Sequence, residues 1–342
     1  MNDLYSYVSY CRYKRPEFRG AIWDVEESMN NDKLKYIKCH GSGNEFVMID
    51  AVAQSLEGVS LAELSVQVCN RQRGIGADGI LLLVRGGDGL YGMRMFNPDG
   101  SEAEMCGNGI RCVARLAEEY VGATTFDLTS GGKIYPTARY APIYGDIPTY
   151  GVKIGVQLWS KDFGMECSES GDFIARVVEN LHPSLCWTTI SVGNPHIVAR
   201  VDSIDYQLLE QLGERVKSLR AEFPNGVNIS LVELRAENHI FVATYERGAG
   251  ITPSCGTAMT SSATAMALQG VCGYDEDILV ENRGGAVHCI CSREGGLATT
   301  LIGNATFVER GTICVGKGFV STVESIESNE IEAWQSFLDS RE

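Results

Sequence analysis

The strongest constraint on the fold of this chain is a pattern of residues that recurs after about 150 positions. Each match is short, but five matches occur in the same order and with nearly the same spacing. Such a long internal period predicts two similar domains, which we expect to be related by a pseudo-twofold axis. The matches are Gly43-Asn44 with Gly193-Asn194, Asp78 with Asn228, Phe96-Asn97 with Tyr245-Glu246, Cys106-Gly107 with Cys255-Gly256, and Gly131-Gly132 with Gly284-Gly285.

Short apolar segments that are separated by turns predict an α+β fold in each domain, because strand signals outnumber helix signals and most connections are short. We place the first domain at residues 34–150, joined by the C-terminal segment 301–342, and the second domain at residues 151–300. Residues 1–33 lack a clear apolar period and form an N-terminal extension, in which Met29 is a candidate for the functional start.

Each repeat carries one cysteine at the end of a glycine-rich loop, directly before a segment with helical spacing of apolar residues. The spacing predicts a helix over residues 110–121 after Cys106, with Gly122 as its C-cap. A thiol beside a helix N-terminus lies near the positive end of the helix dipole and near free amide groups. We therefore expect Cys106 and Cys255 to have lowered pKa values and to form thiolates near neutral pH.

Two such thiols on opposite faces of one ligand can invert a carbon centre. One thiolate removes a proton from the carbon, and the other thiol returns a proton to the opposite face. The intermediate carbanion needs stabilisation, and helix N-termini hold a carboxylate and its developing charge through fixed N–H groups. The segments Gly107-Asn108-Gly109 and Gly256-Thr257 supply such groups without side chains in the way.

The composition limits the partners of the chain. It has 44 acidic and 29 basic residues, hence a net charge of −15, which disfavours nucleic acid and anionic membrane surfaces. No apolar run approaches the ~20 residues of a membrane span, and the N-terminus has no apolar signal segment. We expect a small-molecule ligand and a cytoplasmic protein whose twelve cysteines are mostly reduced. The sequence leaves open whether the chain forms a homodimer.

Metal binding is not expected, because the five histidines are scattered and no Cys-x-x-Cys pair occurs. The loop at residues 73–79 is rich in glycine, but it leads into a strand instead of a helix, so we interpret it as a turn and not as a nucleotide site. Residues 324–342 are predicted to form an amphipathic helix that docks through Ile331, Trp334 and Phe337. Eight further cysteines are interpreted as inert: Cys39, Cys69, Cys112, Cys186, Cys272, Cys289, Cys291 and Cys314.

The motifs HGSGNEFVMID, RGIGADGILLL, FNPDGSEAEMCGNGIRCVARL, SVGNPHIVARVD, FPNGVN and ERGAG…CGT resemble the diaminopimelate epimerases, of the pyridoxal-phosphate-independent amino-acid racemase superfamily. The resemblance covers about residues 35–310 in the family's order. It implies two similar α+β domains, each a barrel-like sheet around a central helix, with the active site in the cleft between them. It also implies interconversion of LL- and meso-diaminopimelate without metal or other cofactor, in lysine and peptidoglycan precursor synthesis.

The resemblance assigns a role to each matching position. Cys106 and Cys255 match the catalytic cysteines, and His196 matches a supporting histidine near the reacting centre, where it and Glu246 orient or tune the thiols. The residues that match substrate-binding positions are Asn44, Asn97, Asn194, Asn228, Glu246 and Arg247, mainly at the distal end of the substrate, and Gly107, Asn108, Gly256 and Thr257 at the reacting carboxylate.

Four departures from the family pattern bear on the substrate. The family commonly has Glu and Leu where this chain has Ile251 and Pro253, and it has glycine where this chain has Ala258. A small residue is replaced by Pro98. Two alternatives therefore stay open: a racemase of another amino acid, such as histidine, or a non-catalytic ligand-binding or thiol-redox protein on the same scaffold.

Overall fold

The computed structural model describes residues 33–158, 163–165, 172–314 and 320–340, and these divide into two compact units. Unit 1 holds the described residues up to Val152 and from Gly303 onward, and unit 2 holds those within Lys153–Ile302. The predicted domain borders lie two residues from these points. The predicted N-terminal extension, with Met29, lies outside the described residues, except that Lys33 begins the first strand.

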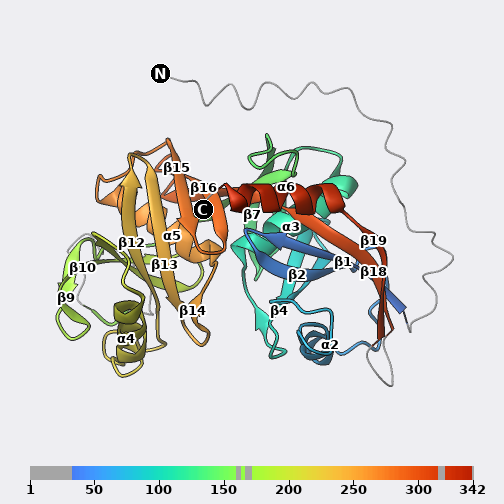
Figure 1. Ribbon diagram of the computed structural model, residues 1–342, viewed down its shortest axis with the longest axis horizontal. Coiled ribbons are helices and arrows are strands. Elements are labelled where there is room, and N and C mark those ends of the chain that lie inside the picture. The colour runs from blue at the N-terminus through green and yellow to red at the C-terminus, as the bar shows by residue number, and fades with distance from the viewer. Residues whose placement is uncertain (1–32, 159–162, 166–171, 315–319, 341–342) are drawn as a thin grey trace. The chain divides into compact units, whose positions relative to one another are not determined.

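Unit 1 is a continuous row of strands in the order β19–β18–β1–β2–β3–β4–β6–β7–β8 (Figure 1). The pairs β2–β3 and β4–β6 are parallel, and the other neighbours are antiparallel. The short β5 pairs with the end of β4. The elements are β1 (Lys33–Gly41), β2 (Asn44–Asp50), α2 (Leu61–Val68), β3 (Ile80–Arg85), β4 (Tyr91–Phe96), β5 (Glu102–Ala103), α3 (Gly107–Val121), β6 (Thr125–Ser130), β7 (Lys133–Tyr140), β8 (Thr149–Gly155), β18 (Thr306–Cys314), β19 (Val320–Ile326) and α6 (Ser328–Asp339).

Unit 2 has the strand order β9–β10–β11–β12–β13–β15–β16–β17. Here β11–β12 and β13–β15 are the parallel pairs, and the short β14 pairs with the end of β13. The elements are β9 (Arg176–Val178), β10 (His182–Ser191), β11 (Pro195–Val201), α4 (Tyr206–Val216), β12 (Asn228–Ala236), β13 (His239–Glu246), β14 (Gly250–Thr252), α5 (Gly256–Leu268), β15 (Asp277–Asn282), β16 (Gly285–Ser292) and β17 (Ala298–Asn304).

The two units share one topology, which accounts for the sequence repeat. In each, a helix joins the first parallel pair (α2 or α4), and a second helix joins the second parallel pair (α3 or α5). The strand register repeats as well: Ile80 faces Phe96 in unit 1, and Ile229 faces Tyr245 in unit 2. The repeated residues are thus equivalent positions of the two units, and the predicted α+β fold is confirmed.

The helix α5 is enclosed by strands, because its sequence is apolar or small on all sides, whereas α3 is amphipathic and exposes Glu119 and Tyr120 near its end. Every residue of α5 from Gly256 to Ala267 is buried, and the helix carries no charge. It contacts β10, β11, β12, β13, β15 and β16, whereas α3 contacts β1, β2, β3 and β4. Each strand set therefore fixes the position of one helix and of the cysteine that precedes it.

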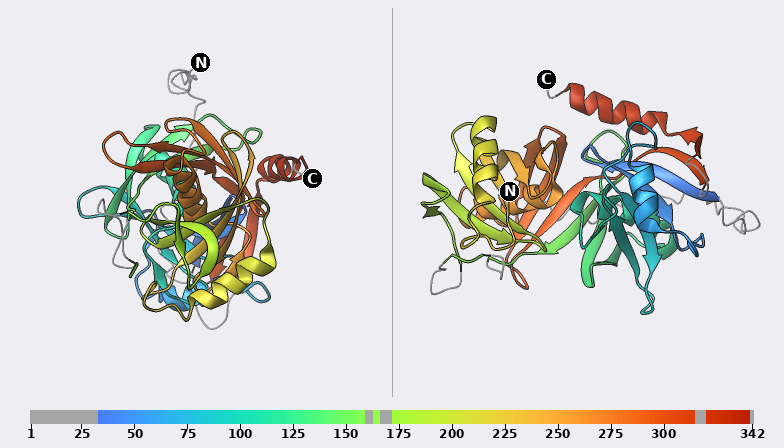
Figure 2. Two further views of the ribbon diagram at one scale, coloured as in Figure 1. Left: turned by 90° about the vertical axis from the view of Figure 1, so that its left-hand side faces the viewer. Right: turned by 90° about the horizontal axis from the view of Figure 1, so that it is seen from below.

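The C-terminal prediction is partly wrong. Residues up to Ile326 form the end of β19, which pairs with β18, and only Ser328–Asp339 is helical. The helix α6 lies along the outside of unit 1 (Figure 2). Trp334 is buried there against the ring of His40, whereas Ile331 remains exposed instead of docking. The strand hydrogen bonds to β18, the strand directly before β19 in the chain, override the helical pattern in this segment.

The helix α2 begins at Leu61, because Ser60 caps it through its hydroxyl, which accepts from the N–H of Glu63. The strand β7 was not predicted, because it contains Pro136, a residue that usually interrupts strands. None of the helices in the described part of the chain is long and apolar enough to cross a membrane.

Candidate functional site

Cys106 and Cys255 occupy the same structural position in their units, as N-caps of α3 and α5. Their backbones are extended and nearly identical, with φ −140° and ψ 112° at Cys106 and φ −137° and ψ 109° at Cys255. The predicted start of each helix directly after its cysteine is confirmed. Gly107 and Gly256 are therefore first helical residues, whose N–H groups have no partner within the helix.

The Cys106 thiol lies among amide groups. Its sulfur accepts a hydrogen bond from the N–H of Gly109 at 3.4 Å and lies 3.9 Å from Oδ1 of Asn44. The side chain of Asn108 donates to the same Asn44 oxygen at 3.4 Å. The other end of the Asn108 amide, Oδ1, is buried and has no hydrogen-bond partner within the described residues. A buried acceptor without a partner suits a ligand that brings an N–H group.

Asn44 is held in place by Asp78, whose carboxylate accepts from the Asn44 amide at 2.8 Å and from the Glu45 N–H at 2.9 Å. Arg71 in turn donates to Asp78 at 2.8 Å. The sequence analysis placed Asp78 in the repeat but interpreted its loop as a structural turn only. Its equivalence to Asn228 was the available signal for this role.

The guanidinium of Arg111 supports the first residue of α3, which follows Cys106, and the turn at Ser42. It is fully buried and donates to the carbonyl of Gly107 at 3.0 Å and to the hydroxyl of Ser42 at 3.0 Å. It also donates to the carbonyl of Asn304 at 3.4 Å. Arg111 thereby ties the first residue of α3 to the turn before Asn44. The sequence analysis missed it, because its partners lie far away in the chain.

Asn97 is the candidate that the structure does not join to this group. Its amide donates to the hydroxyl of Ser101 at 3.0 Å, and its carbonyl accepts from Ser65 at 2.7 Å. No direct hydrogen bond joins Asn97 to Cys106 or Asn44 within the described residues. It lies directly after β4, and its counterpart in the sequence repeat, Glu246, is the last residue of β13.

In unit 2, a series of polar side chains leads to Cys255. His196 lies 3.1 Å from Oδ1 of Asn194, and the Asn194 amide donates to the Thr257 hydroxyl at 3.3 Å. That hydroxyl lies 3.4 Å from the Cys255 sulfur. The structure thus brings together four of the predicted residues. His196 is connected to the Cys255 thiol through Asn194 and Thr257 and does not bond to it directly.

Glu246 and Asn228 complete this group. The Glu246 carboxylate accepts from the hydroxyl of Thr252, another residue that sequence reasoning missed, and lies close enough to the Cys255 thiol to raise its pKa. The Asn228 amide donates to the carbonyl of Pro195 at 3.1 Å and accepts from the N–H of Arg247 at 2.9 Å. The Arg247 guanidinium points elsewhere, to the carbonyl of Asn225 at 2.7 Å.

The predicted lowering of the thiol pKa values is wrong for this structure. Burial raises the pKa of Cys106 to about 11, although the N–H groups of Gly109 and Asn108 act in the opposite direction. Burial also raises the pKa of Cys255, and the nearby Glu246 carboxylate adds to that effect, while the Thr257 hydroxyl opposes it. The helix N-terminus acts as expected, but the loss of water around the sulfur outweighs it.

Acid is expected to destabilise the fold through two buried histidines. Burial lowers the pKa of His196 to about 3 and that of His40 to about 4. An unfolded histidine titrates near 6.5, so below that pH the unfolded chain binds protons that the folded chain does not. Stability should fall as the pH drops from 6.5 to 4, by up to about 1.4 kcal/mol per pH unit for each histidine.

This dependence can be measured by urea unfolding at a series of pH values. The variant His40→Gln should show a shallower fall between pH 6.5 and 4 than the unsubstituted chain, whatever its stability at pH 7. Equal slopes in the variant and the unsubstituted chain would contradict the assignment of His40 as a neutral buried group.

Comparison with known proteins identifies the family. The sequence profile described as diaminopimelate epimerase matches residues 36–137 and 188–308, which include both cysteine loops. The chain belongs to the diaminopimelate epimerase family. A diaminopimelate epimerase of Clostridium acetobutylicum is 36% identical over 314 residues, covering 90% of this chain and 94% of the relative. Another, of Enterococcus faecalis, is 34% identical and covers 88% of this chain and 96% of the relative.

Solved structures share the fold of this diaminopimelate epimerase family member at low sequence identity. A phenazine biosynthesis protein of the PhzF family from Bacillus anthracis aligns with a TM-score of 0.61 and 18% identity, over 83% of this chain and 99% of that one. A hydroxyproline epimerase from Agrobacterium vitis aligns with a TM-score of 0.58 and 13% identity, over 84% and 94%. These likenesses establish the α+β architecture, and the family match establishes an isomerase of the epimerase type.

Proposed function

We propose that this chain is an epimerase that interconverts LL- and meso-diaminopimelate, in the supply of lysine and peptidoglycan precursors. The observation that carries the proposal is the family match together with the two equivalent cysteines at helix N-termini. The relatives at 36% and 34% identity are named for this activity. Because both thiols must remain reduced, we place the reaction in the cytoplasm.

The proposed mechanism uses Cys106 and Cys255 as a pair of acid and base. One thiolate takes the α-proton of the reacting centre and becomes a thiol, and the electron pair left on carbon delocalises into the adjacent carboxylate. The second thiol then donates its proton to the opposite face and becomes a thiolate. The N–H groups at the starts of α3 and α5 would hold the carboxylate, through Gly107-Asn108 and Gly256-Thr257.

The surroundings of the two thiols favour different resting states. The backbone N–H groups of Gly109 and Asn108 favour a thiolate at Cys106, whereas the Glu246 carboxylate beside the Cys255 sulfur disfavours one there. A carboxylate repels a thiolate, so Cys255 keeps its proton more firmly. We assign the resting thiolate to Cys106 and the resting acid to Cys255. Both raised pKa values imply that the cationic ammonium group of the substrate assists deprotonation after binding.

Substrate selection is assigned to the polar side chains around the two cysteines. Asn108 offers a buried carbonyl oxygen with no partner in the described chain, which suits an ammonium group. A guanidinium can hold a carboxylate through two parallel hydrogen bonds, and this is the proposed role of Arg247. The remaining positions proposed for the distal amino-acid end are Asn44, Asn97, Asn194, Asn228 and Glu246.

The structure gives the alternative substrates little support. Ile251, one of the departures from the family pattern, packs against the hydrophobic core of unit 2 and pairs with Tyr245. At Pro253 the carbonyl accepts from the N–H of Gly284 at 2.8 Å. The packing of Ile251 is therefore explained within unit 2 without a different ligand, whereas nothing in the structure explains the proline at position 253.

Exchange of the α-hydrogen with solvent tests the proposal directly. Incubation of the enzyme in D2O with LL- or meso-diaminopimelate should replace the α-hydrogen at the inverted centre, as followed by proton NMR and chiral chromatography. L-Histidine and other amino acids with a single centre serve as comparison substrates. Exchange with histidine alone would identify a histidine racemase, and no exchange with any amino acid would identify a non-catalytic protein.

A further inference from the structure

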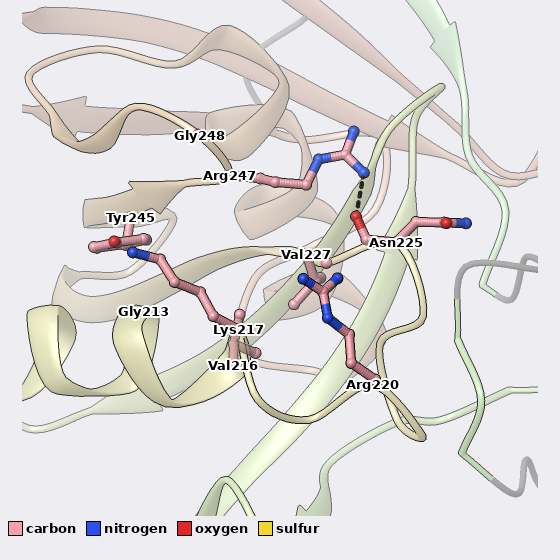
Figure 3. A pocket seen from close by; sticks show the side chains of 10 residues that line it. Gly213, Val216, Lys217, Arg220, Asn225, Val227, Tyr245, Arg247 and Gly248 are labelled. Carbon is pink, nitrogen blue, oxygen red and sulfur yellow. Dashed lines mark hydrogen bonds between the residues drawn. The ribbon is translucent and has the colours of Figure 1, made fainter.

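Unit 2 contains a small pocket with three cationic side chains on its walls (Figure 3). Its volume is about 180 Å³, which is below the range of sites for nucleotide-sized ligands, roughly 300–1,000 Å³. The pocket lies between the C-terminal half of α4, the loop that follows it and the turn after β13. Its walls are formed by Gly213, Val216, Lys217, Arg220, Asn225, Gly226, Val227, Tyr245, Arg247 and Gly248.

Arg220 and Arg247 reach the same side of this pocket from two different segments, with Val227 between them (Figure 3). Arg247 donates to the carbonyl of Asn225 at 2.7 Å, and Arg220 donates to the carbonyl of Pro224 at 3.3 Å. Within the described residues, neither guanidinium forms an ion pair with a carboxylate. Both side chains are exposed, so their guanidinium groups are accessible to an anion from solution.

Lys217 differs from the two arginines. Its ammonium is bonded to the Glu214 carboxylate at 2.6 Å and extends toward the Tyr245 ring, away from the arginines (Figure 3). The charge of Lys217 is therefore already compensated, while the charges of Arg220 and Arg247 are not. Gly226 makes the position of Arg247 feasible, because a Cβ at this glycine would lie 3.0 Å from Cδ of Arg247.

We propose that Arg220 and Arg247 bind one small oxyanion in this pocket, a carboxylate or an inorganic phosphate. Guanidinium groups match the geometry of both through paired N–H donors, and the volume accommodates an anion of that size. Arg220 would then be an additional recognition residue beside Arg247, which already has a proposed role in holding a substrate carboxylate. The link to catalysis, but not the existence of the anion site, rests on the proposed function.

An anion bound in the pocket would affect the residues around Cys255 through the backbone segment that contains Glu246 and Arg247. The N–H of Arg247 donates to Asn228, and Asn228 contacts His196 at 3.5 Å. Glu246, directly before Arg247, lies against the Cys255 thiol. An anion held by the Arg247 guanidinium would therefore fix the segment that carries the carboxylate next to Cys255.

Isothermal titration calorimetry with inorganic phosphate on the full chain tests the site without any need for turnover. The variant Arg220→Gln should weaken phosphate binding by about tenfold or more, as expected for loss of a charge-assisted bidentate contact. Lys217→Gln removes the same charge from the same pocket and should leave binding within about threefold, because its ammonium is already paired. Arg220 is exposed, so its replacement should not disturb folding, and circular dichroism checks this.

Kinetics then distinguish the two sources of the anion. If a substrate carboxylate occupies the pocket, Arg220→Gln should raise KM for diaminopimelate with little change in kcat, and phosphate should inhibit competitively. If free phosphate occupies it, KM in phosphate-free buffer should be unchanged, and any effect of phosphate on the rate should disappear in the variant. The proposal is overturned if phosphate does not bind the unsubstituted chain, or if Arg220→Gln and Lys217→Gln bind it equally.

Discussion

Replacing Cys106 or Cys255 by alanine is expected to abolish epimerisation while each unit keeps its fold. Each thiol has one half of the proton transfer, and the remaining thiol cannot reach both faces of the same carbon. Positioned acid–base groups contribute 10²- to 10⁴-fold, so we expect a loss of about 10³-fold or more in kcat. Conversion of LL- to meso-diaminopimelate, followed by chiral chromatography, measures it.

Two other cysteines provide matched controls. Cys69 and Cys272 are buried thiols in units 1 and 2 respectively, and within the described residues neither is hydrogen-bonded to Cys106, to Cys255 or to the side chains that contact these two thiols. Cys69→Ala and Cys272→Ala should therefore turn over at close to the original rate. Epimerisation by Cys106→Ala or Cys255→Ala at more than a tenth of the original rate would be incompatible with the paired-thiol mechanism.

Replacing the buried Arg111 by methionine should strongly destabilise unit 1. Methionine fills much of the same space but leaves the carbonyls of Gly107 and Asn304 without the donors that Arg111 provides. Each buried polar group that loses its partner costs roughly 1–3 kcal/mol, so we expect a loss of about 3 kcal/mol or more. Urea unfolding measures this change, with the transitions of the two units fitted separately.

The comparison variant is Arg94→Met. Arg94 also makes two hydrogen bonds, both to the carboxylate of Glu102, but the pair is exposed to solvent. Exposed pairs contribute about 0–1 kcal/mol, so this variant should be nearly as stable as the original chain. If Arg111→Met is also within about 1 kcal/mol of the original, then Arg111 does not support the Cys106 loop energetically.

The sequence predicted the architecture well, because the repeated residues occupy equivalent positions in the paired strands of the two units. Positions 149 residues apart, such as Ile80 and Ile229, occupy equivalent places in their ladders, so the spacing had to be preserved for both units to form. The sequence also predicted that Cys106 precedes a helix, because glycines follow it and apolar residues then recur at helical spacing.

Properties that depend on distant packing could not be predicted. The direction of the Cys106 pKa shift is set by burial among neighbouring strands, and a local helix argument contains no information about it. Arg111 lies in a helix pattern where a charged residue suggests a solvated face, yet it meets Asn304, 193 positions later. The hydrogen bond from the Arg247 guanidinium to the carbonyl of Asn225 is of the same kind.

The repeated topology gives the two cysteines equivalent places but unequal neighbours. At one matched pair of positions, unit 1 has Asn97, directly after β4, and unit 2 has Glu246, the last residue of β13. The Glu246 carboxylate raises the pKa of Cys255, whereas an amide such as that of Asn97 carries no charge. A scaffold can thus repeat its backbone while the side chains at matched positions make its two thiols unequal in proton affinity.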